Sequence, residues 1–89
     1  MRRVRLAISG EVQGVSFRNF VKRNAVLLNL KGFVMNLNTG GIEAVFEGED
    51  ENIKKIVALC YIGPERAKVK DINVKEEEFS AEFKDFSVL

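Results

Sequence analysis

The spacing of apolar residues changes several times along this chain, and that change limits its fold more than any other feature. Apolar and other residues alternate over residues 4–8, 33–37 and 42–46. Between and after these stretches, apolar residues recur every three or four positions over residues 17–28 and 53–60. A period of two is typical of a strand with one buried face, whereas spacings of three and four mark one face of a helix. The pattern therefore predicts strand, helix, strand, strand and helix in that order.

Residues that start and stop regular structure support this order. The first strand is predicted to end at Ser9-Gly10, and Asn29 and Gly32 can stop the first helix and restart the chain. The tract "NLNTGG" supplies the turn of a hairpin between the second and third strands. Asp50 is the candidate N-cap of the second helix, and "GP" follows the end of that helix.

The last third of the chain contains two further strand candidates, residues 67–75 and 79–88. Each has a slip in its alternation, between Val69 and Ile72 and between Phe83 and Phe86, which predicts a bulge or an irregular edge. The complete order predicts an α+β ferredoxin-like sandwich, a five-stranded and mainly antiparallel sheet with two helices on one face. Residues 1–89 are predicted to form a single domain.

Composition excludes several classes of function. The chain has 14 Lys and Arg, 13 Asp and Glu, no His and one Cys, so its formal net charge is only +1. This balance argues against a nucleic-acid partner. With no His and one Cys the usual zinc ligand sets cannot be assembled, although carboxylates could form a magnesium site; we expect no metal and no cofactor. A single Cys cannot form an internal disulfide, and no apolar run is long enough to span a membrane. We expect a monomeric cytoplasmic protein.

The connection between the first strand and the first helix is suited to bind an anion. In the predicted topology the first two strands are parallel, so their carboxyl ends share one edge of the sheet. Residues 10–16 leave the first strand there, and their N–H groups can converge on an anion at the start of a helix. Arg18 on the first helical turn could hold two phosphate oxygens, and Asn36 at the end of the second strand could hold a water.

Two motifs in these segments resemble those of the acylphosphatase family. "GEVQGVSFR" matches the run G-x-V-Q-G-V-x-F-R at every fixed position, and "GFVMNLNTG" with the later Gly48 matches a second run. The resemblance covers almost the whole chain and implies an enzyme that hydrolyses small acyl phosphates to a carboxylate and inorganic phosphate. It implies catalytic roles for Arg18, which holds the phosphate, and for Asn36, which orients the attacking water. The predicted phosphate loop, residues 11–18, contains Glu11, Val12, Gln13, Gly14, Val15, Ser16, Phe17 and Arg18.

Some positions depart from the family pattern. Glu11 stands where relatives commonly have a basic residue, and a carboxylate there could repel substrate or point into solvent. The alternative function is therefore a catalytically weak module of the same fold that binds phosphate or acyl phosphate. Asn29 and Ala81 each replace a glycine, and Ile42 replaces valine. These three changes are expected to affect stability more than chemistry.

Two other functions can be compared with this one. "CYIGPER" places Cys60 and Arg66 at the C-x5-R spacing of cysteine phosphatases, but Cys60 belongs to the apolar stripe of the second helix. Some ferredoxin-like sheets bind RNA through exposed aromatics on central strands, but "GIEAVFEG" lacks the required mixture of aromatic and basic residues. Gln13 and Ser16 also have an alternative role, since they could simply satisfy backbone groups of the loop.

Overall fold

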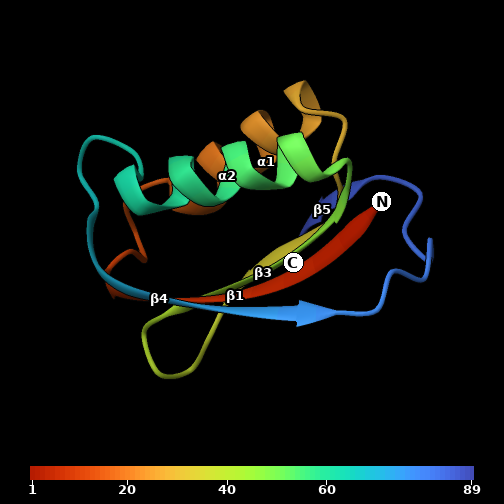
Figure 1. Cartoon of the computed structure of the whole chain (residues 1–89). Helices are drawn as coiled ribbons and strands as arrows, with labels where there is room; N and C mark the ends of the chain where they lie inside the picture. The colour runs from red at the N-terminus through yellow and green to blue at the C-terminus, as the bar shows by residue number, and fades with distance from the viewer.

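The protein has two layers, with two helices lying on one face of a five-stranded sheet (Figure 1). The computed structural model describes residues 1–89. The elements in chain order are β1 (Arg2–Glu11), α1 (Phe17–Leu27), β2 (Lys31–Asn36), β3 (Ile42–Gly48), α2 (Asp50–Ile62), β4 (Lys68–Glu77) and β5 (Phe86–Val88). The predicted fold class is confirmed. Neither helix has the length and apolar content that crossing a membrane would require.

The order of strands across the sheet is β4-β1-β3-β2-β5. β1 and β2 are both antiparallel to the central β3, so they run parallel to each other, as the sequence predicted. Only the β2–β5 pair has directly hydrogen-bonded parallel strands. The carboxyl ends of β1 and β2 therefore lie at the same end of the strands in the sheet, where the chain enters α1.

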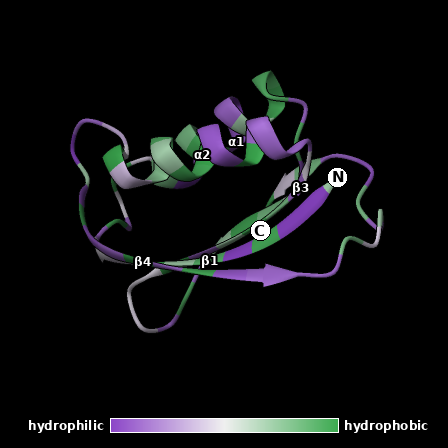
Figure 2. Cartoon of the chain, viewed as in Figure 1, coloured by the Kyte–Doolittle hydropathy of each residue, from purple (hydrophilic) through white to green (hydrophobic).

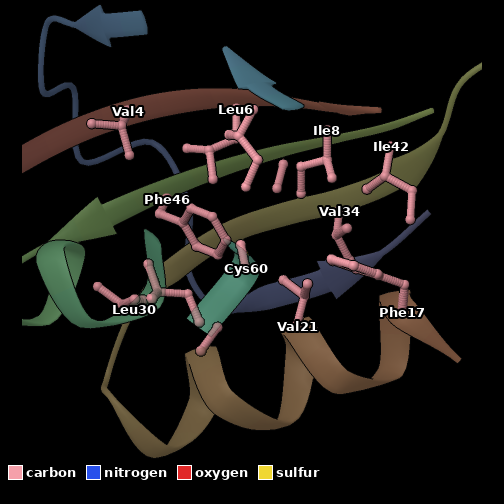
Figure 3. Close-up of a cluster of buried hydrophobic side chains, with 14 of the residues drawn as sticks. Val4, Leu6, Ile8, Phe17, Val21, Leu30, Val34, Ile42, Phe46 and Cys60 are labelled. Carbon is pink, nitrogen blue, oxygen red and sulfur yellow. The ribbon is translucent and has the colours of Figure 1, made fainter. Parts of the chain in front are cut away.

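The hydrophobic core fills the space between the helices and the sheet (Figure 3). Val4, Leu6 and Ile8 of β1 point into it, while the intervening residues face the other side of the sheet. Figure 2 shows both helices with mixed hydrophilic and hydrophobic residues, as expected for helices with one buried stripe. Phe46 of β3 stacks on Phe86 with ring centroids 5.4 Å apart, which holds the short β5 against the core.

The prediction of a strand over residues 79–88 is wrong except at its end, because β5 covers only Phe86–Val88. β4 and β5 occupy opposite edges of the sheet, so the chain must travel about 19 Å between them. Residues 78–85 connect these two strands and cross the face of the sheet that the helices do not cover. There Phe83 packs on Phe33 at 5.9 Å between ring centroids, and the Ser80 N–H donates to Glu47 Oε2 at 3.0 Å.

Smaller differences concern the ends of elements. β1 continues through Glu11 instead of ending at Ser9-Gly10, because β4 pairs with it as far as Lys68. The register shift in this pairing leaves residue 70 as an extra residue of β4, which confirms the first predicted bulge. α2 has Glu49 at its N-cap, so Asp50 is the first helical residue and not the cap.

The backbone at two of the positions that depart from the family pattern explains why relatives have glycine there. Asn29 and Ala81 both have a φ of 56°, in the left-handed region that glycine enters without strain. Glycine is therefore the expected residue at both positions. Asn29 tolerates this conformation better than Ala81, because the side chain of asparagine can hydrogen-bond locally.

A group of ion pairs covers part of the face without helices. Glu77 accepts hydrogen bonds from Arg5 Nε at 2.8 Å and from Arg3 Nε at 2.9 Å. Arg3 also contacts Glu82 and the buried Glu47. The hydrogen bond from Arg5, followed by that from Arg3, holds the pKa of Glu77 below its usual value. Arg3 likewise lowers the pKa of Glu82.

Acidification from about pH 7 to about pH 3 is expected to destabilise the protein through these carboxylates. A pKa depressed in the folded state contributes stability above the unfolded-state value, about 4.3 for Glu. That contribution disappears as the pH falls through the folded-state value. Thermal melts should show native protein with a higher Tm than Glu77→Gln near neutral pH, and the difference should close on acidification. Glu65→Gln, an exposed carboxylate outside the ion pairs, is the control; a difference independent of pH would contradict the prediction.

Candidate active site

The backbone of the phosphate loop presents a run of free N–H groups. None of the N–H groups from Gln13 to Asn19 donates a hydrogen bond within the protein, and the first helical donor is Phe20, which bonds Ser16 O at 3.0 Å. Gly14 has a φ of 73° and Ser16 a φ of 63°. A left-handed residue followed by a helical one turns successive N–H groups toward a common point, and the dipole of α1 adds positive potential. The free N–H groups and the helix dipole thus produce a positive potential at this end of α1.

A cavity of about 330 Å³ lies beside these N–H groups. It is lined by Val12, Gly14, Ser16, Phe17, Arg18, Asn19, Asn36 and Val88. The structure thus brings the two predicted catalytic residues, Arg18 from α1 and Asn36 from the end of β2, to one cavity. No carboxylate is among the lining residues, so no fixed negative charge in its wall opposes an anion.

Arg18 keeps its charge available to a ligand. Its Nη1 donates to the main-chain oxygen of Leu89 at 2.8 Å, and the Leu89 N–H donates to Val34 O on β2 at 2.9 Å. This pair of contacts fixes one side of the guanidinium. Arg18 forms no ion pair with an Asp or Glu side chain, and its N–H donors other than the one on Leu89 make no hydrogen bond within the protein, so they are free for phosphate oxygens.

Asn36 is also free to bind a ligand. It is the last residue of β2, pairs with Ile42 of β3, and is exposed. Its side-chain amide makes no hydrogen bond within the protein, although the amide carries both donors and an acceptor. An amide of this kind can hold a water molecule by accepting from it or donating to it.

Other residues of the phosphate loop lie outside the cavity wall. The side chain of Glu11 is 77% exposed and its Oε2 lies 4.0 Å from Lys68 Nζ, beside β4. Val15 is partly buried against the core, so only its N–H remains a candidate donor to a ligand. Gln13 Nε2 donates to the carbonyls of Leu37 and Gly41, both at 2.8 Å.

Sequence reasoning missed three contributors to the site. Asn19 and Val88 line the cavity, and Leu89 holds Arg18. Asn19 could have been inferred from its place on the first turn of α1. No signal in the sequence placed the end of the chain beside α1, because the register of β5 cannot be read from three residues.

The cysteine-phosphatase alternative is wrong. Cys60 lies in α2 and is fully buried among apolar side chains, as Figure 3 shows. This burial raises the pKa of its thiol to about 12, so the thiolate needed as a nucleophile does not form near neutral pH. Cys60 is a small core residue.

The fold and the site together define a ferredoxin-like α+β domain with a loop of free N–H groups at the carboxyl end of β1. The comparisons with known proteins go further. The family model Acylphosphatase matches residues 4–88. An acylphosphatase of Roseiflexus sp. (strain RS-1) is 42% identical over 89 residues, which are 100% of this chain and 96% of that relative. The chain therefore belongs to the acylphosphatase family.

Solved structures agree with this assignment. The crystal structure of acylphosphatase from Bacillus subtilis superposes with a TM-score of 0.96 at 34% identity, covering 100% of this chain and 99% of that one. An acylphosphatase from Coxiella burnetii gives a TM-score of 0.94 at 35% identity, covering 99% of this chain and 92% of that one. The resemblance inferred from the two motifs is confirmed.

Proposed function

We propose that this protein hydrolyses the carboxyl-phosphate bond of small acyl phosphates and releases a carboxylate and inorganic phosphate. One observation carries the proposal: the cavity brings together a guanidinium group with N–H donors to spare, free backbone N–H groups and a free side-chain amide. Membership of the acylphosphatase family supports the reaction, and it favours an enzyme over the weak binding module considered above.

The phosphate group is proposed to bind between Arg18 and the N–H groups of the phosphate loop. Charge spreads over the equatorial oxygens in the transition state of phosphoryl transfer, so fixed donors around them are the main requirement. Arg18 supplies a full positive charge, and the loop supplies donors that do not need to move. No metal is needed to explain this stabilisation.

Asn36 is proposed to orient the attacking water. The water oxygen forms a bond to phosphorus as the bond from phosphorus to the acyl oxygen breaks, and the carboxylate leaves with that electron pair. Because a carboxylate is a good leaving group, no general acid is required. The proton of the water passes to a phosphate oxygen of the substrate, so a protein base is also unnecessary.

Glu11 is not expected to disable the enzyme. Its carboxylate is exposed, lies near Lys68 and does not line the cavity. Water and salt screen an exposed charge of this kind, so its repulsion of substrate should be small. The alternative of a catalytically weak module thus has no support from the geometry around Glu11.

We also propose the substrate class, the cellular compartment and the oligomeric state. The near balance of charge supports a small-molecule substrate in place of a nucleic acid, and the lone buried Cys suits a reducing compartment such as the cytoplasm. We also expect the protein to act as a monomer, since one chain supplies both Arg18 and Asn36 to the cavity and the proposed reaction calls for no residue of a second chain.

Hydrolysis of benzoyl phosphate, a small aromatic acyl phosphate, tests the proposed function. Native protein with a chelator present is expected to turn over this substrate and to be inhibited competitively by inorganic phosphate. Asn36→Ala should lower kcat by a factor of about 10² while the inhibition constant for phosphate changes little. Asn38→Ala, on the exposed turn after β2, should behave like native protein. Absence of turnover by folded native protein would reject the proposed function.

A further inference from the structure

Gln13 connects the phosphate loop to the turn that follows Asn36. Its side-chain nitrogen Nε2 donates to Leu37 O and to Gly41 O, each at 2.8 Å. The residues at the two ends of these hydrogen bonds are far apart in sequence, on the β1–α1 connection and on the β2–β3 turn. Since both partners are carbonyl oxygens, only the NH₂ group of the amide can face them, and both of its protons are used.

The two carbonyls that Gln13 holds belong to the hydrogen bonds that close the β2–β3 turn. Leu37 N–H donates to Gly41 O at 2.8 Å, and Gly40 N–H donates to Leu37 O at 3.1 Å. Each carbonyl therefore accepts one backbone proton and one proton from Gln13. A shift of the turn relative to the phosphate loop would break both hydrogen bonds from Gln13.

Asn36 immediately precedes Leu37, so the position of the turn fixes the end of β2 that carries Asn36. The side chain of Asn36 has no hydrogen bond of its own within the protein. Its placement opposite the phosphate loop thus depends on the backbone at this end of β2. Gln13 is the side chain that ties this backbone to the loop.

We infer that Gln13 is a positioning residue, which sets the distance between the water held by Asn36 and the phosphate held by the loop. The inference rests on the proposed function and deepens it. It gives the side chain of Gln13 a role other than binding phosphate, and its N–H remains a candidate donor. A displacement of about 1 Å in such a site can lower the rate by a factor of about 10².

Gln13→Met tests the inference, because methionine has a similar length and cannot donate a hydrogen bond. We expect kcat for benzoyl phosphate to fall by a factor of about 10 to 10², with KM and the inhibition constant for inorganic phosphate unchanged. A residue that only stabilised the loop would instead weaken phosphate binding. Asn38→Ala on the same turn is the matched control and should keep native kinetics.

A double-mutant cycle shows whether Gln13 acts through Asn36. Adding Gln13→Met to Asn36→Ala should cause no further loss of kcat, because the side chain being positioned is already absent. Two losses that multiply would overturn the inference. So would an unchanged kcat in Gln13→Met when native protein is active and Asn36→Ala is impaired, a result that leaves the proposed function intact.

A measurement independent of turnover completes the test. With saturating inorganic phosphate, Gln13→Met should retain the phosphate-induced NMR shifts of the loop amides but change the side-chain amide resonance of Asn36. An unchanged Asn36 resonance in folded Gln13→Met would overturn the inference even if the protein proved inactive. Inactivity of native protein would reject the proposed function separately.

Discussion

Replacing Arg18 with alanine is expected to lower kcat/KM for benzoyl phosphate by a factor of about 10² to 10³. Arg18 lines the cavity, and its guanidinium has no Asp or Glu partner in the protein. Its charge is thus available to stabilise the phosphate as negative charge develops on the equatorial oxygens. Initial rates together with inhibition by inorganic phosphate provide the measurement, and both rate and phosphate affinity should decrease.

Arg18→Lys should recover little of this loss. Lysine keeps the positive charge but lacks the planar fork that donates to two phosphate oxygens while a third N–H bonds the main-chain oxygen of Leu89. Arg23→Ala, on an exposed position of the same helix and outside the ion pairs, controls for a general loss of charge. Equal losses in Arg18→Ala and Arg23→Ala would mean that overall charge, not the site, attracts the substrate.

The sequence predicted that Arg18 and Asn36 lie near each other, because the places of both residues depend on backbone topology. Once β1 and β2 are parallel, the start of α1 and the end of β2 must meet at one edge of the sheet, and Arg18 and Asn36 follow. The partners of Gln13 and the contact between Arg18 and Leu89 were beyond this reasoning. Those hydrogen bonds join side chains to distant backbone oxygens, and no periodicity encodes such contacts.

The order of most elements could also be predicted from the sequence, but the prediction of a strand over residues 79–88 was largely wrong. Burial on one face imposes a clear period on β1, β2 and both helices, and β3 keeps the alternation of Ile42, Ala44 and Phe46 with Glu43 and Glu47 although it is buried on both faces, so the order of elements could be read. The segment around Phe83 also alternates, but Phe83 packs on Phe33 from a covering segment that crosses the open face. Alternation does not show whether the backbone pairs with a strand, and in this segment Phe79 and Ala81 are exposed although they alternate with polar residues.

Gly32→Ala is expected to cost at least about 4 kcal/mol in the free energy of unfolding, enough to prevent folding of a marginally stable domain. Gly32 is buried in β2 with a φ of +138°, and a Cβ there would lie 1.8 Å from the carbonyl oxygen of Val45 on β3. β2 would have to move away from β3 along the pair that carries Asn36. Urea unfolding followed by circular dichroism provides the measurement.

Gly40→Ala separates backbone strain from steric clash as the two sources of the expected loss in the free energy of unfolding. Gly40 has a φ of +94°, but a Cβ added there would meet no atom within 4 Å, so alanine introduces backbone strain without a collision. We expect a loss of only about 1 to 2 kcal/mol, the strain of a left-handed residue. If Gly32→Ala cost no more than Gly40→Ala, the close approach of β2 to β3 would not be what requires glycine. A much larger loss of stability for Gly32→Ala would mean that the pairing of β2 with β3, which places Asn36, requires the absence of a Cβ atom at position 32.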